Sequence, residues 1–370
     1  MVAFTVEAEE RSVQSMSKIL VTGSSGLIGS QAVEYFDKLG HSVIGVDNNM
    51  RRVFFGDAGD TTWNLERLKS ATTRFEHRNL DIRDREAIFA LFGEHRFDAI
   101  LHCAAQPSHD KAKEIPLVDF EVNALGTANL LEAMRQFCPE ARLVFLSTNK
   151  VYGDAPNEIP LKELETRYDY ADPTDWNGVD ENCRIDRTTH SIFGASKVAA
   201  DILAQEYGRY FGLAVGVFRG GCLTGPNHSG VQLHGFLSYL VKVAIAGEKY
   251  TVFGYKAKQV RDNIHSFDVV RAAEEFFLNP RPGEVYNIGG GRENSVSILE
   301  AIDAIQRITG RAIRWEYRDE PRKGDHICYI SNLTKFRSHF PNWQLTYGLE
   351  KIFSEIANAE HRQMKMAGRI

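Results

Sequence analysis

The fold is decided by a stretch near the start of the chain, Ile19-Leu20-Val21-Thr22-Gly23-Ser24-Ser25-Gly26-Leu27-Ile28-Gly29. An apolar run leads into three glycines, and an amphipathic segment at residues 30–36 follows them. This order predicts a strand, a tight turn and a helix. Gly23 permits the turn, Gly26 leaves room for a phosphate, and Gly29 lets the helix lie close to the strand. Backbone amides and the helix dipole then converge on one point, which predicts a binding site for a pyrophosphate.

An acidic residue, Asp47, follows a second apolar run at residues 42–46. A carboxylate about twenty residues after such a glycine turn can accept both ribose hydroxyls of an adenosine, and it repels a 2′-phosphate. The sequence therefore predicts NAD rather than NADP as cofactor; the alternative is a glycine turn in an unrelated α/β protein. We expect cofactor contacts from Gly23, Ser25, Gly26, Leu27, Ile28, Gly29, Asp47, Asn48 and Asn49.

Strand and helix patterns alternate through the first half of the chain. The expected elements are strands at residues 75–82, 98–105 and 142–148 and helices at residues 85–92 and 119–133. Such alternation predicts an α/β fold with a doubly wound parallel sheet. The ligand of this kind of sheet lies beyond the carboxyl ends of the strands, where Asp81, Ala104 and Thr148 fall.

The sequence predicts one main domain and a smaller lobe. The expected division is a flexible extension at residues 1–16, an NAD-binding domain over residues 17–223 and a smaller α/β substrate-binding lobe over residues 224–370. Within that lobe, residues 258–291 are expected to return to the main domain. Two irregular segments are predicted to lie over a ligand: a loop at residues 48–64 that covers an adenosine or a sugar, and a lid at residues 154–189.

Composition narrows the class of protein. The chain has 370 residues, of which 43% are hydrophobic, and a formal net charge of −5. Because Lys and Arg are spread along the chain, a nucleic-acid surface is not expected. The five cysteines show no CxxC spacing, the histidines form no HxH or HExxH pattern, and no secretory signal or apolar run of membrane-spanning length is present. We therefore expect a cytoplasmic protein with no membrane segment and no metal site.

A series of different short motifs is spread over nearly all of residues 17–355. They are Thr22-Gly23 with Gly26 and Gly29, Asp81-Ile82, Ala104-Ala105-Gln106, Asn123 with Gly126, Ser147-Thr148, Val151-Tyr152-Gly153, Lys197, Arg261-Asp262 with His265, and Tyr286-Asn287-Ile288-Gly289. Through them the chain resembles the extended short-chain dehydrogenase/reductase family, which contains nucleotide-sugar epimerases and dehydratases. Within this family it is most similar to the CDP-paratose (CDP-tyvelose) 2-epimerases, through the stretches at residues 147–154, 165–168 and 258–262.

The resemblance implies a Rossmann domain that binds NAD, a nucleotide-diphosphate sugar as substrate and a transient keto sugar. It also implies a homodimer, formed by the helices around residues 123–137 and 195–211 of each subunit. Thr148 is implied to bond the sugar hydroxyl that is oxidised, and Lys197 to reach the nicotinamide ribose. Cofactor contacts are implied for Asp81, Ile82, Ala104, Ala105, Gln106, Asn123 and Lys197, and substrate contacts for Gln106, Asn149, Cys222, Arg261, Arg322 and Asp325.

Arg261 also supports substrate binding through its own chemistry. A diphosphate in a partly closed cleft favours the fork of donors that a guanidinium presents. The sequence therefore predicts a phosphate clamp at Arg261, and the alternative is a surface ion pair with the neighbouring Asp262.

One residue departs from the family pattern. The family places a catalytic Tyr four residues before its Lys, so that the ammonium lowers the pKa of the phenol and the phenolate removes a hydroxyl proton. Phe193 stands at that position before Lys197. Three hypotheses stay open: a natural subfamily with another proton-transfer group, an active epimerase whose Tyr was replaced to trap substrate, or a protein that binds nucleotide sugar without turnover. The nearest alternative groups are Thr148, Lys150, His190, Lys197 and Cys222.

An enzyme of this kind can catalyse epimerisation, or it can be a dehydratase or decarboxylase that eliminates water or carbon dioxide. Dehydratases of the family commonly carry an Asp-Glu pair after the catalytic Thr, where this chain has Asn149-Lys150. The sequence therefore favours NAD-dependent epimerisation. The candidate catalytic residues are Thr148, Lys150, His190, Phe193 and Lys197.

Overall fold

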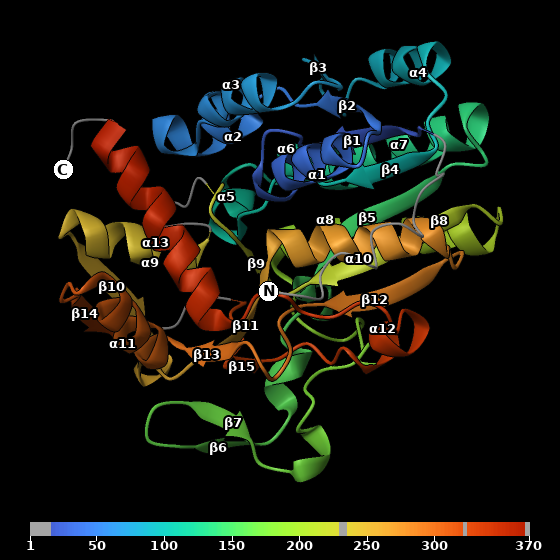
Figure 1. Cartoon of the computed structure of the whole chain (residues 1–370). Coiled ribbons are helices and arrows are strands. Elements are labelled where there is room, and N and C mark those ends of the chain that lie inside the picture. The colour runs from blue at the N-terminus through green and yellow to red at the C-terminus, as the bar shows by residue number, and fades with distance from the viewer. Residues whose placement is uncertain (1–15, 229–234, 321–323, 367–370) are drawn as a thin grey trace, which may run out of the picture.

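The computed structural model describes residues 16–228, 235–320 and 324–366. The expected N-terminal extension at residues 1–16 therefore lies outside the described residues, apart from Met16. Figure 1 shows a main domain built on a large sheet, with a smaller lobe beside it at the left of the view. Among the helices of the described ranges, none has both the length and the apolar character that are needed to cross a bilayer.

Seven parallel strands form the central sheet, in the order β12-β8-β5-β4-β1-β2-β3 (Figure 1). In chain order they are β1 (Lys18–Thr22), β2 (Ser42–Val46), β3 (Phe75–Arg78), β4 (Ala99–His102), β5 (Arg142–Thr148), β8 (Ala214–Gly220) and β12 (Glu284–Ile288). The predicted α/β fold with a doubly wound parallel sheet is confirmed. The third and fourth strands are shorter than predicted, and their polar or small ends become loops at the edge of the sheet.

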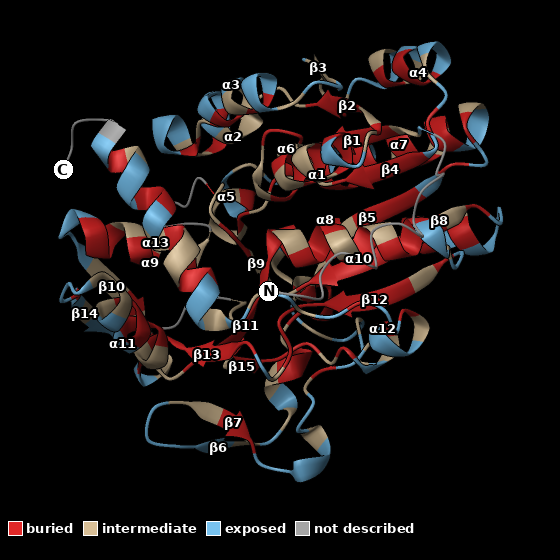
Figure 2. Ribbon diagram, in the orientation of Figure 1, coloured by how far each residue is buried: buried red, intermediate tan, exposed pale blue. Residues whose placement is uncertain are grey.

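Helices cover both faces of this sheet. Alternate residues of a strand point to opposite faces, so Ile19 and Val21 pack with α1 (Leu27–Lys38) and α10 (Ser266–Leu278). Leu20 packs on the other face, in a core that α4, α7 and α8 complete. These helices are α4 (Arg85–Glu94), α7 (Gly126–Phe137) and α8 (Ser191–Arg209). Figure 2 shows the result: the central strands are buried, and the helices expose only their outer faces.

The order of the strands creates a crevice beside β1. The strand that follows β1 in the chain lies on one side of it, whereas β4 lies on the other side. Connections from the carboxyl ends of β1 and β4 therefore run in opposite directions across the sheet, which leaves a crevice between them. The glycine turn and the small residues after β4 open into this crevice.

The helix that was predicted at residues 119–133 is interrupted by a wider turn. It consists of α6 (Pro116–Phe120), a π-helical turn at Glu121–Leu125 and α7. Single π-helical turns of this kind are frequent at functional sites. Here the turn carries Asn123, whose side-chain amide donates hydrogen bonds to the backbone of Gln106 and to the side chain of Ser196 on α8. A short helix, α5 (His109–Glu114), precedes this segment.

The smaller lobe has its own apolar core. Its helices are α9 (Phe236–Ala246), α11 (Ile298–Thr309) and α13 (Leu349–Met366), which pack with the parallel pair β10 (Lys249–Phe253) and β14 (Arg314–Arg318). A second, four-stranded sheet connects this lobe to the main domain. It contains β9 (Cys222–Thr224), β11 (Val260–His265), β13 (Ser295–Ser297) and β15 (Cys328–Tyr329).

The return of the chain to the main domain begins later than expected. Residues 260–265 form β11, which pairs with strands of the smaller sheet, so the start of the expected segment 258–291 belongs there. The return begins at α10, which packs on α1, and β12 then joins the central sheet. A further short helix, α12 (Thr334–His339), also packs against β12.

The two segments predicted to cover a ligand are folded differently. Residues 48–64 contain α2 (Met50–Phe55), a 3-10 turn at Gly56–Gly59 and the start of α3 (Thr62–Ala71), because the Asn49 side chain bonds Asp60 and Thr61 and closes the segment on itself. Residues 154–189 contain the hairpin β6 (Leu161–Glu163) and β7 (Tyr168–Tyr170), at the bottom of Figure 1. None of the residues 154–189 lines the large pocket described below, so the lid prediction is wrong.

A buried ion pair joins α8 to the central sheet. Arg219 on β8 donates two hydrogen bonds to Asp201 on α8, at 2.8 and 3.0 Å, and the two side chains are 5% and 1% exposed. Asp201 also accepts a hydrogen bond from Ser147 on β5, at 2.5 Å. The third guanidinium nitrogen of Arg219, Nη1, donates a hydrogen bond to the hydroxyl of Tyr152. This hydroxyl in turn donates to the side-chain oxygen of Asn287 on β12. Three strands and one helix thus share one polar cluster.

We expect Asp201→Ala to destabilise the protein by about 3–5 kcal/mol, because it leaves the Arg219 guanidinium buried without a counter-charge. Urea unfolding at neutral pH measures this change. The matched control is Asp303→Ala, which removes an exposed ion pair with Arg307 and is expected to cost less than about 1 kcal/mol. Equal losses for the two variants would contradict the role of the buried pair.

Candidate active site

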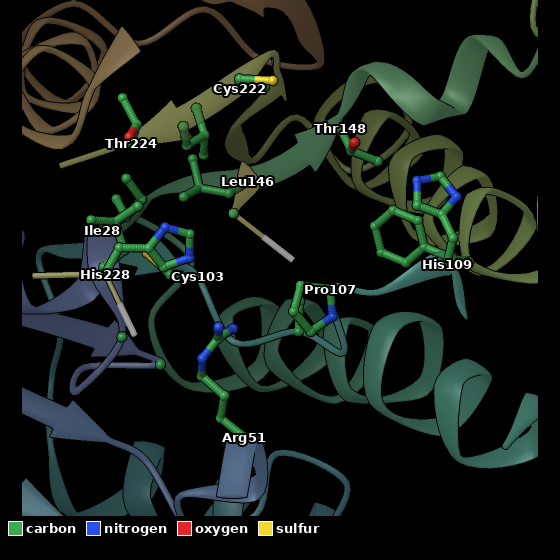
Figure 3. A pocket seen from close by; sticks show the side chains of 18 of the residues that line it. Ile28, Arg51, Cys103, Pro107, His109, Leu146, Thr148, Cys222, Thr224 and His228 are labelled. Atoms are coloured by element: carbon green, nitrogen blue, oxygen red, sulfur yellow. The ribbon is translucent and has the colours of Figure 1, made fainter. Parts of the chain in front are cut away.

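One large pocket lies at the carboxyl ends of the central strands, with a cavity volume of about 480 Å³. Residues of the glycine turn, of β4 and β5, of α8 and of the smaller lobe all line it. Figure 3 shows Thr148 and His109 toward one end of the pocket and Ile28, Arg51 and His228 toward the other. One continuous pocket therefore has residues of the glycine turn and residues of the smaller lobe in its wall.

The glycine turn is built for close backbone approach. Gly23 has a φ of +66°, and a β-carbon there would lie 2.9 Å from the amide nitrogen of Ala104. A β-carbon on Gly29 would collide with the carbonyl of Gly23. Gly26 ends the turn as the N-terminal cap of α1, with no side chain in that place. The predicted cradle is thus open at the positive end of the α1 dipole.

One hydroxyl beside this cradle fits an absent polar ligand. The side-chain oxygen of Ser25 is buried, has no hydrogen-bond partner among the described residues, and belongs to a residue that lines a cavity. Buried polar groups are normally satisfied, so such atoms indicate a place where a ligand supplies the partner. Of the turn residues predicted to contact a cofactor, Gly23, Gly26, Leu27, Ile28 and Gly29 line the pocket, and Ser25 lines a smaller cavity beside it.

Asp47 points back at the glycine turn. Its carboxylate accepts hydrogen bonds from the backbone amides of Ser25, at 2.9 Å, and Asn49, at 2.8 Å. Burial raises the pKa of Asp47, although these two amides act in the opposite direction. The neighbouring Asn48 donates to Asp81 at 3.1 Å, so the ends of β2 and β3 are joined at the pocket. Together with the open cradle, this carboxylate fits the adenosine end of NAD.

The predicted contacts after β4 fall into two groups. Ala104 and Ala105 line the pocket, as does Ile82 across from them. Gln106 and Asn123 do not line it, because they bond each other: the backbone amide of Gln106 donates to Asn123 Oδ1 at 3.0 Å, and Asn123 donates back to the Gln106 carbonyl at 3.1 Å. The structure therefore assigns these two residues to the support of the pocket wall rather than to its surface.

Asp119, which the sequence analysis missed, holds this support together. Its carboxylate accepts hydrogen bonds from Gln106 at 2.6 Å and from Ser196 on α8 at 2.5 Å. Burial raises the pKa of Asp119, while these two donors lower it. No motif indicated this residue, because its partners come from distant parts of the chain. Its effect is to fix the loop before α5 against the first turns of α8.

Phe193 lines the pocket, and its ring packs against the ring of His109. Phe193 is 6% exposed, and the two ring centroids lie 5.1 Å apart. The imidazole Nδ1 of His109 lies 3.2 Å from the hydroxyl oxygen of Ser191, at the start of α8. No sequence motif indicates His109, because nothing in the local pattern connects it with Phe193.

Lys197 belongs to α8, and Thr148 is the last residue of β5. The ammonium of Lys197 donates to the carbonyl of Leu146 at 2.8 Å and lies 4.2 Å from the ring centroid of Phe145. Burial lowers the pKa of Lys197 to about 8, although Asp201 and Asp119 act in the opposite direction. Thr148 ends β5, and its hydroxyl oxygen accepts a hydrogen bond from the backbone amide of Lys150 at 3.2 Å. Both residues line the pocket.

A charged cluster lies where the smaller lobe meets the pocket. Arg261 donates to Asp325 at 2.6 Å, and the ammonium of Lys150 lies 3.7 Å from the same oxygen. Lys150 also donates to the carbonyl of Gly324 at 2.8 Å, and burial lowers its pKa to about 8. Burial alone would raise the pKa of Asp325, but Arg261 and Lys150 hold it well below its usual range. With two cations and one anion, the cluster suits an anionic ligand.

The alternative partner considered for Arg261 is wrong. Asp262 is fully buried on the other side of β11, where it accepts hydrogen bonds from the amides of Gly291 and Ser331. Arg261 pairs with Asp325 instead, from a segment that is distant in the sequence. The predicted substrate residue Arg322 lies outside the described residues.

The other candidate residues differ in position. Asn149 and Cys222 line the pocket, and burial raises the pKa of the Cys222 thiol to about 12, so this thiol is not a base near neutral pH. His190 does not line the pocket; its Nε2 lies 2.9 Å from the carbonyl oxygen of Val151. Arg51, on α2, was missed by the sequence analysis and points into the pocket (Figure 3). In the described part of the chain, no group of His, Cys, Asp and Glu side chains is arranged to hold a metal ion.

Comparison with known proteins agrees with this geometry. The model of the NAD-dependent epimerase/dehydratase family matches residues 19–289. CDP-paratose 2-epimerase of Salmonella typhi is 31% identical over 347 residues, which cover 91% of this chain and 98% of the relative. A dTDP-glucose 4,6-dehydratase of Escherichia coli is also 31% identical, over 90% of this chain and 86% of the relative. The identity alone therefore does not separate an epimerase from a dehydratase.

The solved structure of UDP-glucose 4-epimerase from Thermus thermophilus in complex with NAD is similar in fold. It superposes with a TM-score of 0.74 at 27% sequence identity, over 93% of this chain and 99% of the relative. The family description names the cofactor that the glycine turn and Asp47 predict, and this relative holds it. The chain belongs to the NAD-dependent epimerase/dehydratase family.

Proposed function

We propose that this protein epimerises a nucleotide-diphosphate sugar with bound NAD, through a transient keto sugar, most like the CDP-paratose 2-epimerases. One observation carries the proposal. A single pocket extends from the glycine turn and Asp47 to the cluster of Lys150, Arg261 and Asp325, and Thr148 lines it as well. A dinucleotide and a sugar diphosphate can therefore occupy one space with the sugar between them.

The residues at the glycine turn are suited to hold the dinucleotide. The turn amides and the α1 dipole would bind its pyrophosphate, Asp47 would accept the adenosine ribose hydroxyls, and Lys197 would bond the nicotinamide ribose. When bound, NAD supplies a two-electron acceptor for a carbon atom of the sugar. The protein's own task is to orient the sugar, exclude water and move the hydroxyl proton.

The other end of the pocket is suited to hold the sugar diphosphate. Arg261 presents a planar fork of donors to phosphate oxygens, and the Lys150 ammonium adds a second positive charge beside it. In the protein without ligand, Asp325 holds both cations in place. Thr148 would then bond the hydroxyl that is oxidised, with Asn149 and Cys222 along the sugar.

Two other functions are compatible with the family but have less support from the residues of this chain. A dehydratase or decarboxylase uses the same transient ketone but then needs acid and base groups for elimination, and the positions after Thr148 carry Asn149 and Lys150 instead of two acids. A protein that only binds nucleotide sugar is supported by Phe193 alone. Epimerisation is favoured, because it requires only oxidation and reduction at one carbon and no acid and base groups for an elimination.

We also propose that the protein is a homodimer, formed through the outer faces of α6, the following π-helical turn and α8. Three apolar side chains on the first two elements are exposed: Leu117 by 77%, Phe120 by 51% and Leu125 by 47%. Ile202 and Phe211, on α8 and just after it, are exposed too. These elements pack side by side, so their apolar side chains form a surface that a second copy can cover.

A conversion assay separates epimerisation from elimination. Incubated in D₂O with NAD and a panel of CDP-paratose, UDP-glucose, UDP-glucuronate and dTDP-glucose, the protein is expected to invert one carbon of at least one sugar. Product mass should stay unchanged and no deuterium should enter at that carbon, because the hydrogen that leaves returns to it. Mass spectrometry and proton NMR measure both. Loss of one water mass would show a dehydratase, and no conversion of any sugar would contradict an enzyme of this class for these substrates.

Asp47→Ala is expected to weaken NAD binding about tenfold to a hundredfold, because a charge-assisted hydrogen-bond acceptor contributes about 1.5–3 kcal/mol. Titration calorimetry with NAD and NADP measures the change, and the preference for NAD should shrink since the charge that repels a 2′-phosphate is lost. The matched control is Asp57→Ala, an exposed carboxylate nearby, which should leave NAD binding unchanged. Unchanged NAD binding by Asp47→Ala would exclude this residue from the cofactor site.

Phe120→Glu is expected to convert a homodimer into a monomer, because a charge would be buried at the centre of the proposed contact. Light scattering at micromolar concentration measures the molar mass. The control is Leu278→Glu, an exposed leucine on α10 that the proposed contact leaves uncovered. A monomeric wild-type protein would refute the dimer.

A further inference from the structure

The imidazole of His109 lies in the pocket wall beside Phe193. We propose that His109 exchanges the proton of the sugar hydroxyl, in the place of the phenol that Phe193 lacks. This inference rests on the proposed function, since it names the proton-transfer group of the same site. It follows from what surrounds the ring of Phe193.

The position of His109 matches the missing group. Its ring lies against the ring of Phe193, with centroids 5.1 Å apart and planes at 57°, and both residues line the pocket. The imidazole and the ring that would carry a phenol therefore border the same pocket. Thr148, the residue proposed to bond the sugar hydroxyl, lines the same pocket and lies toward the same end in Figure 3.

The backbone of His109 is fixed from both sides. Ser108, the residue before it, is fully buried; its amide and its carbonyl both bond the side chain of Gln106, at 2.8 and 2.9 Å. The Ser108 hydroxyl caps α5 by accepting a hydrogen bond from the amide of Lys111. Because Gln106 is itself held by Asp119, the imidazole is placed by a rigid part of the wall.

A strained residue orients the imidazole. Ser191 has a φ of +63°, a left-handed conformation that is uncommon for a residue other than glycine. In this conformation its hydroxyl oxygen lies 3.2 Å from His109 Nδ1 and also accepts a hydrogen bond from the amide of Gly194. If Nδ1 donates to this oxygen, Nε2 is the nitrogen that carries the lone pair. Such strain is typical of functional sites.

The other candidates lie elsewhere or are less suited to accept the proton. His190 bonds the carbonyl of Val151 and does not line the pocket. The ammonium of Lys150 donates to Gly324 and pairs with Asp325, which suits a phosphate contact better than a proton acceptor. The thiol of Cys222 stays protonated near neutral pH, because burial raises its pKa to about 12. Among these groups, His109 is the best placed to exchange a proton with the sugar.

The proton balance is closed by this assignment. Oxidation of a secondary alcohol to a ketone breaks the O–H bond and the C–H bond, and bound NAD would accept the hydrogen of the C–H bond with both electrons, as a hydride, and would later return it to the same carbon. The hydroxyl proton moves to the imidazole, which becomes an imidazolium. When the ketone is reduced on its other face, the new hydroxyl takes this proton back and the imidazole is neutral again. No net proton is consumed, as an epimerisation requires.

The test measures the turnover of the wild type and of three variants on the nucleotide sugar that the wild type converts. His109→Gln is expected to lower turnover by about 10²–10⁴-fold, whereas KM and NAD affinity stay nearly unchanged. His109→Gln combined with Phe193→Tyr is expected to regain at least about tenfold of this loss, because a phenol returns beside Lys197. The matched control is His361→Gln, on the exposed side of α13, which should not change turnover.

A measurement without turnover checks the position of the imidazole. Diethyl pyrocarbonate should modify His109 in the protein without added ligand, and NAD together with the converted nucleotide sugar should protect it, as peptide mass mapping reports. Turnover of His109→Gln within threefold of wild type, or modification of His109 that ligands leave unchanged, overturns the inference while the proposed function stands. A wild type that converts no nucleotide sugar overturns the proposed function, and the inference with it.

Discussion

The buried pair of Arg219 and Asp201 is the interaction on which the geometry of the site depends. Asp201 lies one helical turn after Lys197 on α8 and also accepts the hydroxyl of Ser147, the residue before Thr148. One carboxylate therefore sets the distance between the helix that carries Phe193 and Lys197 and the strand that carries Thr148. A buried ion pair adds little net stability, but separating its two charges in the protein interior is costly. The pair therefore holds the helix and the strands of the site in fixed relative positions.

The second half of the site is assembled from segments far apart in the chain. Lys150 follows β5 of the main domain, Arg261 belongs to β11 of the smaller sheet, and Asp325 precedes β15. Their contact connects the two parts of the molecule at the pocket. A ligand diphosphate that binds these cations would compete with Asp325 for Arg261 and with the carbonyl of Gly324 for Lys150.

The features that the sequence predicts well are local in the chain. The glycine turn, Asp47 and the alternation of strands and helices depend on neighbours within one supersecondary unit, so their spacing alone indicates their structure. Gln106 and Asn123 were predicted to touch the cofactor, yet they bond each other, because the π-helical turn brings Asn123 to the loop after β4. Contacts such as those of His109 with Phe193, or of Arg261 with Asp325, depend on the packing of elements that are distant in the sequence. No local sequence pattern predicts them.

The most direct test of this account is a crystal structure of the protein with NAD and a nucleotide-diphosphate sugar. We predict the dinucleotide pyrophosphate over the glycine turn with its adenosine ribose on Asp47, and the sugar diphosphate on Lys150 and Arg261. The sugar ring should then lie within hydrogen-bond reach of both Thr148 and His109. A ribose turned away from Asp47, or a diphosphate bound away from Lys150 and Arg261, would contradict the account.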